Sequence, residues 1–282
     1  MPITRDAIRK YYDQNTNLFL KFSRIKTGQA ENIHRSLWTD GAQTLDEALN
    51  VANARILAEI ESVTPTNARI ADLGCGVGAG LFYIYPRLHE PASAFGLTLS
   101  PLQAKLARES AMQLGLQDQI LFAEGDFTSV PLANDLDAVY SVEAIVHAIE
   151  PEKYFLEASR LLRKGGRLIL VDDFIAARPV LRSESKWLNA FIDGWHVPGL
   201  RTAAQSTSFA DKNNLRLLKN ENLTQHLRLR NLPNSMAGAL LFIGNHLPIR
   251  HAILPSMLGS MALQQCLKMG IVEYRFLVFE KI

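Results

Sequence analysis

The chain has 282 residues, of which 48% are hydrophobic, and a formal net charge of +2. This low charge and high apolar content exclude an intrinsically disordered protein. The near-neutral balance argues against nucleic acid as a partner, since such proteins usually present a strongly basic face. The first residues are charged, and the longest apolar runs, such as 236–244, are too short to cross a bilayer. We therefore expect a cytoplasmic protein without stable membrane insertion, with Cys75 and Cys266 as reduced thiols and with homo-oligomerisation left open.

The first 68 residues carry no strand pattern and are typical of helices. Thr44 and Glu47 have the spacing of a capping box, which predicts a helix start at this point. We interpret residues 1–68 as an N-terminal helical lid fused to a core domain of residues 69–282. Two later segments are expected to add cover over the strand ends, at about 175–212 and 225–272.

From residue 69 onward, short apolar runs alternate with helical patterns. Five of these runs predict strands, at 68–74, 93–100, 119–127, 136–144 and 166–174. Apolar residues three and four apart predict helices at 101–116 and 151–166, the second of which should end at Gly165 and Gly166. Two further runs are expected to close the sheet, 214–224 and 273–282. The order predicts an α/β protein with a doubly wound, mainly parallel seven-stranded sheet, helices on both faces and an antiparallel last strand.

Residues 72–80, DLGCGVGAG, follow the first predicted strand and open a helix. Ligands of open α/β sheets bind at the carboxyl ends of the strands, where strand order reverses. Gly74, Gly76 and Gly78 let the chain turn sharply and let a ligand approach the backbone, whereas a bare turn would not need Asp72 in front of them. The glycines also fit the dinucleotide fingerprint. However, the second strand ends GLTLS, without the acidic residue that the ribose of a nicotinamide cofactor requires.

The pattern Asp72-x-Gly74-x-Gly76-x-Gly78 resembles the first motif of S-adenosylmethionine-dependent methyltransferases with the Rossmann-like fold. The resemblance covers about residues 69–174. It implies S-adenosylmethionine as the cofactor, with the glycine loop against its methionine part. It also implies that Asp72 accepts a hydrogen bond from the cofactor amine, directly or through water.

The end of the second predicted strand extends this resemblance. GLTLSPLQ (96–103) is similar to the small-molecule branch of the family, which contains sterol, tocopherol and polyketide or terpenoid methyltransferases. The similarity implies cofactor contacts from Thr98, Ser100 and Gln103 in place of the usual acidic ribose contact. Ser100 and Gln103 also have capping-box spacing, with Pro101 at the first helical position, and both roles can hold together.

Asp126 and Phe127 follow the third predicted strand and resemble the third-strand motif of the same family. The resemblance implies that Asp126 contacts the adenine amine and that Phe127 lies on the adenine ring. A strand-end turn with a solvated carboxylate is the alternative.

The fourth predicted strand is followed by Glu143 and His147, at a spacing that resembles sterol and prenyl diphosphate C-methyltransferases. If the turn is helical, the two side chains share a face. An alkene that takes a methyl group becomes a carbocation and must lose a proton, so a base is required. Glu143 and His147 are the candidates for that base, against the alternatives of a solvated acid and a satisfied histidine.

Aromatic residues outside the sheet could stabilise such a cation. Tyr11 and Tyr12 begin a segment that resembles the lid of small-molecule methyltransferases, and Trp195 and His196 lie in the first cover segment. We expect Tyr11 to join the catalytic group and Tyr12, Trp195 and His196 to contact substrate, although each could be a core residue.

Two charged clusters are less specific. Four cations could hold a diphosphate but are more typical of a solvated helix face, namely Arg178, Arg182, Lys186 and Arg201. Asp172 and Asp173 are expected in a turn rather than in a substrate or metal site. No metal ligands are predicted.

The sequence thus predicts an enzyme that transfers a methyl group from S-adenosylmethionine to a small, largely apolar molecule, at carbon of an isoprenoid or polyketide-like substrate. An O- or N-methyltransferase of the same fold is the nearer alternative. A nicotinamide-dependent oxidoreductase and a non-catalytic cofactor-fold binding protein are more distant ones.

Overall fold

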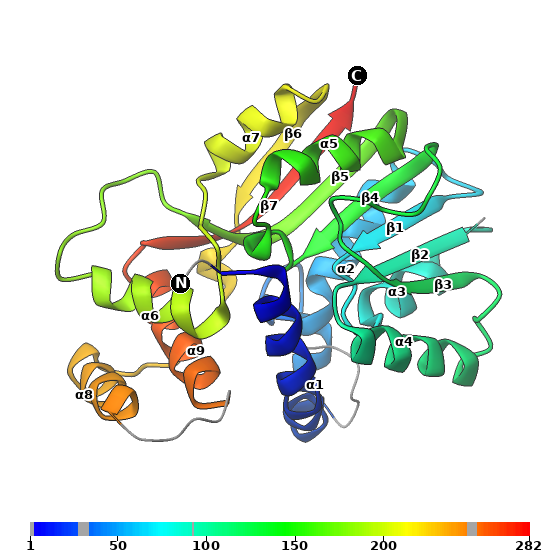
Figure 1. The fold of residues 1–282 in the computed structure, drawn as a ribbon. Coiled ribbons are helices and arrows are strands. Elements are labelled where there is room, and N and C mark those ends of the chain that lie inside the picture. Colours follow the sequence, from blue (N-terminus) through cyan, green and yellow to red (C-terminus); the bar gives the residue numbers. More distant parts are fainter. Residues whose placement is uncertain (1–2, 28–33, 92, 247–252) are drawn as a thin grey trace.

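The computed structural model describes residues 3–27, 34–91, 93–246 and 253–282. Within these residues, seven strands form one sheet in the order β3-β2-β1-β4-β5-β7-β6 (Figure 1). Their bounds are Arg69–Leu73 (β1), Ser93–Thr98 (β2), Ile120–Glu124 (β3), Leu136–Val142 (β4), Leu162–Ile175 (β5), Leu215–Asn222 (β6) and Val272–Lys281 (β7). Strands β1 to β5 pair in parallel, whereas β7 runs antiparallel to its neighbours β5 and β6. The predicted sheet, including its antiparallel last strand, is confirmed.

Among the described residues, α-helices follow β1, β2, β4, β5 and β6, whereas a loop without a helix joins β3 to β4. The bounds of the α-helices are Arg5–Thr27 (α1), Leu45–Glu61 (α2), Ala79–Ile84 (α3), Pro101–Gln113 (α4), Pro151–Leu161 (α5), Ser185–Trp195 (α6), Ala203–Asp211 (α7), Asn234–His246 (α8) and Ile253–Lys268 (α9). The described residues also form three short 3-10 helices, at Tyr85–Arg87 (η1), Ile145–His147 (η2) and Thr224–His226 (η3). In the described part of the chain, every helix is too short or too polar to cross a bilayer.

Helix starts follow local side-chain chemistry. At α2 the Glu47 backbone N–H donates to Thr44 Oγ1 over 3.2 Å, while the Glu47 carboxylate accepts from the Thr44 N–H over 2.9 Å, which confirms the capping box. At α4 Ser100 Oγ accepts from the Gln103 N–H over 3.1 Å, and Pro101 occupies the first turn. The Gln103 side chain does not complete a second capping box, because it bonds to Thr98 and Thr16 instead.

The predicted end of the 151–166 helix is wrong. Helix α5 ends at Leu161, and Leu162 already pairs with Leu136 of β4 as the first residue of β5. Gly165 has φ +78°, and a Cβ on Gly166 would lie only 3.0 Å from the Leu136 carbonyl oxygen. The two glycines therefore permit the irregular start of β5 rather than end the preceding helix.

Helices cover both faces of the sheet, as predicted. One apolar core includes side chains of α2, α3 and α4 against the sheet, and the other includes side chains of α5 and α7 (Figure 1). Helix α2 packs against β4 and β5, and α7 packs against β6, so both lie on the sheet rather than over its strand ends. The domain boundary at residue 68 stays a prediction.

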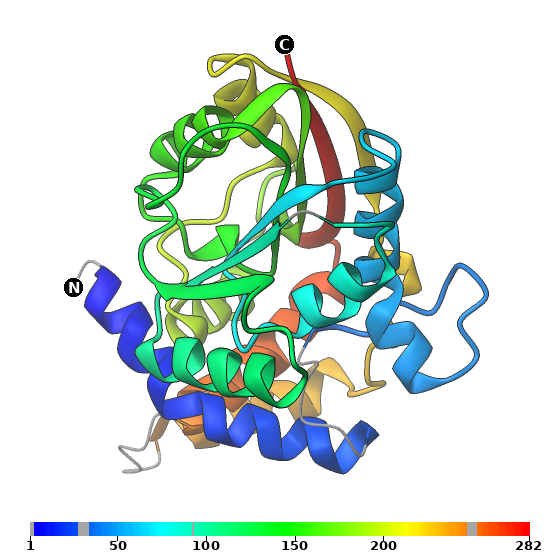
Figure 2. The same cartoon turned by 90° about the vertical axis from the view of Figure 1, so that its right-hand side faces the viewer.

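The remaining helices lie outside the two sheet layers. Helix α1 packs against α4 (Figures 1 and 2), and α9 packs against both α6 and α8. Residues of α1, α4, α6 and α9 and the strand ends line the candidate site.

Candidate active site

A cavity of 390 Å³ lies at the carboxyl ends of β1, β2, β3 and β4. Strand order reverses between β1 and β4, which is where open α/β sheets bind their ligands. Each strand contributes the residues at its end, and α1, α6 and α9 supply the opposite wall. The lining includes Gly74, Gly76, Thr98, Gln103, Asp126, Phe127, Glu143, His147, Tyr11, Tyr12 and Trp195. The fold thus brings together most of the predicted site residues.

Gly74, Gly76 and Gly78 all have positive φ, but the lack of a Cβ atom has a different effect at each of them. A Cβ on Gly74 would lie 2.3 Å from the Ala144 Cβ, so this glycine lets the β1 and β4 loops touch. A Cβ on Gly78 would lie 2.7 Å from the Phe122 ring, and Gly78 does not line the cavity. Gly76 lines the cavity, and the space where its Cβ would stand is open. The bare backbone at Gly76 therefore fits the close approach of a cofactor.

Asp72 lies beneath this loop and does not line the cavity. It is buried, and a Cβ on Gly80 would lie 3.3 Å from Asp72 Oδ2 and 3.5 Å from the Tyr140 hydroxyl oxygen. Burial raises the pKa of Asp72 to about 8, although the neighbouring Tyr140 hydroxyl partly offsets this. Its contact with the cofactor amine stays a prediction.

The end of β2 is tied to α1 through predicted cofactor residues. Gln103 Oε1 accepts from Thr98 Oγ1 over 2.8 Å, and Gln103 Nε2 donates to Thr16 Oγ1 over 3.2 Å. Ser100 does not line the cavity, and its hydroxyl donates to Asp13 Oδ1 over 2.5 Å. These bonds place α1 across the β2 edge of the cavity.

The end of β3 is also closed by α1. Asp126 Oδ1 accepts from the Thr128 N–H over 2.8 Å, and Asp126 Oδ2 lies 2.6 Å from Arg5 Nε. Arg5 also bonds to Glu150 over 2.8 Å. Phe127 also lines the cavity.

Glu143 follows β4 with φ +52°, and its N–H donates to the Val171 carbonyl over 2.8 Å. Its Oε1 accepts from the Arg35 N–H over 3.0 Å and from the Tyr274 hydroxyl over 2.9 Å. Burial alone would raise the pKa of Glu143, but the charge of Arg35 and these hydrogen bonds hold it below its ordinary value. Glu143 is therefore an anion at neutral pH.

His147 ends the 3-10 helix η2, so it does not share an α-helical face with Glu143. Burial lowers the pKa of His147 to about 4, which leaves the imidazole neutral. Its Nδ1 lies 3.4 Å from the His196 carbonyl oxygen, and its ring lies edge-on to Tyr12 with centroids 5.3 Å apart. Glu143 and His147 line one cavity but have separate partners.

The predicted aromatic residues form a continuous group over the cavity. Tyr11 contacts both Tyr12 and His196 edge-on, with ring centroids 5.3 Å apart in each case, and Tyr12 contacts His147. His196 itself does not line the cavity. Burial raises the pKa of Tyr11 to about 12, so it stays a phenol.

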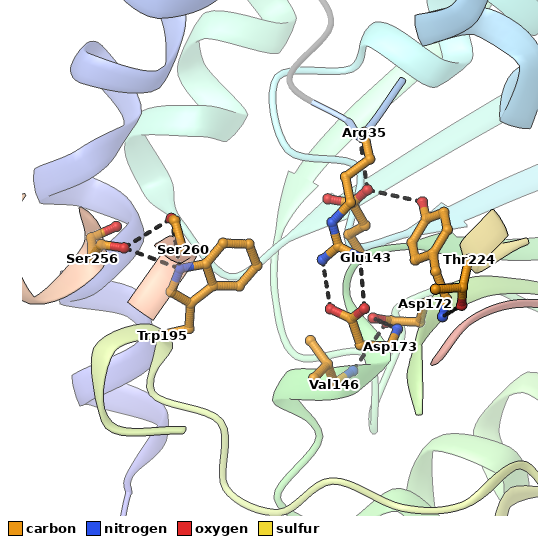
Figure 3. Close-up of polar contacts among 10 residues, drawn as sticks. Arg35, Glu143, Val146, Asp172, Asp173, Trp195, Thr224, Ser256 and Ser260 are labelled. Carbon is orange, nitrogen blue, oxygen red and sulfur yellow. Dashed lines mark hydrogen bonds and ion pairs between the residues drawn. The ribbon is translucent and has the colours of Figure 1, made fainter. Parts of the chain in front are cut away.

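Hydrogen bonds join the three cover helices. Tyr11 of α1 lies with its hydroxyl 3.0 Å from Ser256 Oγ of α9. Trp195 of α6 donates from Nε1 to Ser260 Oγ over 3.1 Å and to the Ser256 carbonyl over 3.3 Å (Figure 3). Helices α1, α6 and α9, which we call the roof helices, are thus connected to one another by side-chain hydrogen bonds.

The sequence patterns missed Arg35 and Tyr274 and misplaced Asp173. Arg35 donates to both Asp173 carboxylate oxygens, over 2.6 and 2.5 Å (Figure 3). The guanidinium carbon also lies 4.7 Å from the Tyr274 ring centroid. The Arg35 and Asp173 side chains are only 17% and 1% exposed. Adjacent acids within the apolar run of β5 were a signal, because buried charges need partners.

The predicted turn at Asp172 and Asp173 is therefore wrong, because both residues lie inside β5. Asp172 accepts from the Val146 N–H over 3.1 Å and from the Asp173 N–H over 2.7 Å. Among the described residues, no three His, Cys, Asp or Glu side chains are grouped to hold a metal ion.

The predicted helix-face cations do not line the cavity. Arg178 precedes α6 and pairs with Glu184 at 2.9 Å, and Lys186 lies 4.8 Å from the Trp187 ring centroid. A diphosphate role for these cations has no support in this geometry.

Comparison with known proteins agrees with this site. A family model described as a methyltransferase domain matches residues 71–170. A methyltransferase of Streptomyces halstedii is 27% identical over 165 residues, which are 57% of this chain and 56% of the relative. A sterol 24-C-methyltransferase of Gibberella zeae is 31% identical over 159 residues, 56% of this chain and 39% of the relative. The matches thus span about half or less of these relatives.

Solved structures agree over more of the chain. A sarcosine dimethylglycine methyltransferase from Galdieria sulphuraria has a TM-score of 0.73 at 21% identity, covering 93% of this chain and 98% of the other. A geranyl diphosphate methyltransferase in complex with geranyl diphosphate and sinefungin has a TM-score of 0.72 at 16% identity, covering 99% of both chains. At these identities the likeness shows the fold. With the matching methyltransferase domain at residues 71–170 and the glycine cradle, it follows that this chain contains a methyltransferase domain with the Rossmann-like fold.

Proposed function

We propose that the protein transfers the methyl group of S-adenosylmethionine to a carbon atom of a small, largely apolar molecule of isoprenoid or polyketide type. The observation that carries the proposal is an anionic Glu143 beside aromatic walls in the cavity next to the glycine loop. The cofactor supplies an electrophilic methyl group. The chain's own residues then need to align a nucleophile and handle the charge that appears on it.

The pKa values of Glu143 and His147 favour methylation of carbon over methylation of oxygen. A hydroxyl is best deprotonated by a base whose pKa lies near the working pH. The pKa of His147 is about 4, and that of Glu143 is below its ordinary value, so both are weak bases towards a hydroxyl. A carbocation is a far stronger acid than a carboxylic acid, so Glu143 takes its proton readily. The bond to the lost hydrogen then becomes the new double bond.

The cavity walls suit the same chemistry. Phe127, Tyr12 and Trp195 present aromatic side chains, and Ile8 and Val142 present aliphatic ones. An aromatic face stabilises a desolvated cation by about 0.5–2 kcal/mol. These walls also exclude water, which would otherwise capture a carbocation.

Nitrogen methylation is the second candidate, because an amine nucleophile also becomes a cation that Glu143 would stabilise. The structural likeness to a sarcosine dimethylglycine methyltransferase supports keeping it. The apolar lining ranks it below carbon methylation.

Labelled products separate these outcomes. The protein is incubated with methyl-labelled S-adenosylmethionine and panels of prenyl, sterol, polyketide and amine compounds, and NMR locates the label. We expect label on carbon. We also expect Glu143→Gln to abolish turnover while S-adenosylhomocysteine affinity stays within about twofold. Label found on oxygen or nitrogen alone, or full turnover by Glu143→Gln, would overturn the proposal.

A further inference from the structure

We infer that Arg35, Asp173 and Tyr274 are positioning residues, which hold Glu143 as a net negative charge facing the reacting end of the cofactor. The inference rests on the proposed function only in using the same cavity. It assigns a function to residues of the N-terminal segment, β5 and β7, all of which are distant in sequence from the glycine loop.

The first step is the orientation of the carboxylate. The Glu143 backbone is left-handed, and its N–H is bonded to Val171, so the residue has little freedom at its base. Both side-chain hydrogen bonds, from the Arg35 N–H and the Tyr274 hydroxyl, fall on Oε1. Two donors on one oxygen fix the carboxylate plane and stabilise its charged form.

The second step is the charge balance. The charged or titratable groups that act on Glu143 come from α1, the segment after it, β5 and β7; they are Tyr12, His34, Arg35, Asp172, Asp173 and Tyr274. Burial lowers the pKa of His34 and raises that of Asp172 to about 8, which leaves both largely neutral at pH 7. The Arg35 charge is matched by Asp173 in a two-point ion pair. One negative charge, on Glu143, therefore remains.

The third step is the location of that charge. Ala144, next to Glu143, is the residue that would touch a Cβ on Gly74, and Glu143 lines the same cavity as Gly74 and Gly76. S-adenosylmethionine carries a positive sulfur that its product S-adenosylhomocysteine lacks. A fixed anion at this place favours the charged donor over the neutral product. The positioning residues should therefore increase the affinity for S-adenosylmethionine relative to the affinity for S-adenosylhomocysteine.

Calorimetry with these two compounds tests the inference without a substrate. The quantity measured is the Kd of S-adenosylhomocysteine divided by the Kd of S-adenosylmethionine, from pH 5 to 7, where Asp172 stays largely neutral. Both compounds share one amino-acid tail, so its titration cancels in the ratio. We expect a flat ratio for the unaltered protein and a ratio at least about tenfold lower for Glu143→Gln at every pH.

Tyr274→Phe removes one donor and keeps the ring under Arg35. Its ratio should match the unaltered protein at pH 7 and fall towards that of Glu143→Gln at pH 5, because the carboxylate then gains a proton more easily. The paired variant Arg35→Met with Asp173→Asn should behave likewise and does not leave Asp173 unpaired. Tyr85→Phe, which removes a buried hydroxyl bonded to the Pro91 carbonyl, is the matched control and should follow the unaltered protein.

A Tyr274→Phe ratio that stays flat to pH 5, while Glu143→Gln is lowered, would overturn the positioning role. An unchanged ratio in Glu143→Gln would overturn the fixed anion itself. Neither result depends on where the methyl group is transferred, so labelled products can refute the proposed function while this inference stands, and the reverse.

Discussion

The Tyr274 hydroxyl donates to Glu143 Oε1 over 2.9 Å, although 131 residues separate the two. The Arg35 N–H donates to the same oxygen from 108 residues away on the other side. The position of the Glu143 carboxylate therefore depends on hydrogen bonds from two distant parts of the sequence, the segment after α1 and strand β7. This relation connects the stability of the fold with the charge state of the site.

Breaking the Arg35–Asp173 ion pair should strongly destabilise the protein. In Arg35→Met, Asp173 keeps a buried charge without its partner, and such losses cost about 3–5 kcal/mol. Adding Asp173→Asn should restore much of the free energy of unfolding. Urea denaturation followed by circular dichroism measures each value.

The matched control is Arg69→Met, which removes the exposed ion pair with Asp135. These side chains are 42% and 54% exposed, so the loss should stay below about 1 kcal/mol. Equal losses for Arg35→Met and Arg69→Met would contradict the importance given to burial.

Gly76→Ala should separate backbone strain from cofactor binding. Gly76 and Gly115 have φ of +55° and +69°, and neither has an atom within 4 Å of its ideal Cβ. Each alanine should therefore cost a similar 1–2 kcal/mol, roughly, of unfolding free energy. Only Gly76→Ala places a methyl group in the cavity, so it alone should weaken S-adenosylhomocysteine binding, by more than about tenfold. Equal affinities in the two variants would show that the cofactor does not approach this backbone.

The features that sequence predicted well are local. Apolar periodicity and turn residues were sufficient for the seven strands, and the spacing of Thr44 and Glu47 was sufficient for the α2 cap. The β-strand ends then placed Glu143, His147 and the glycine loop at one edge, because parallel strands align their carboxyl ends.

The features that sequence missed depend on distant contacts. Gly165 resembles a helix stop, but pairing of Leu162 with β4 decides where α5 ends. Adjacent aspartates such as Asp172 and Asp173 are typical of a turn. Asp173 can instead be buried within β5 because Arg35 pairs with it. No local pattern identifies Arg35 as that partner.

Stability without cofactor should fall as pH rises from 6.5 to 8. The pKa of Asp72 is raised from 3.8 to about 8 by burial, and that of Asp172 likewise. Between these values the folded state binds more protons than the unfolded state, so each pH step upward favours unfolding. Below pH 6.5 the lowered pKa of His147 makes stability rise with pH, because the unfolded state then binds more protons at this residue. The predicted fall in stability is therefore limited to pH values above 6.5.

Asp72→Asn should make this fall shallower, because asparagine cannot release a proton. Thermal unfolding at fixed ionic strength measures the slope. Asp118→Asn, at an exposed position, is the control and should leave the slope unchanged. A steeper or unaltered slope in Asp72→Asn would show that Asp72 is ionised in the fold.

Tyr11 and Ser256 should be energetically coupled. Their oxygens lie 3.0 Å apart in a buried contact between α1 and α9. Tyr11→Phe and Ser256→Ala should each cost about 1 kcal/mol, and the double variant should cost less than the sum by about 0.5–1.5 kcal/mol. Denaturant unfolding of the two single variants and the double variant gives the free energies for this double-mutant cycle. As a control, the losses of Tyr11→Phe and the distant Ser159→Ala should be additive. Additivity in the Ser256 cycle would mean that the roof helices are not joined here.

The place of β7 in the sheet also bears on how the protein is made. Strand β7 follows the other six described strands in sequence, yet it lies between β5 and β6 and carries Tyr274 to Glu143. A growing polypeptide on the ribosome can form the glycine loop early, but it lacks the interior strand and one of the two donors to Glu143. The Glu143 carboxylate can therefore gain its second donor only after β7 has been synthesised and has inserted between β5 and β6.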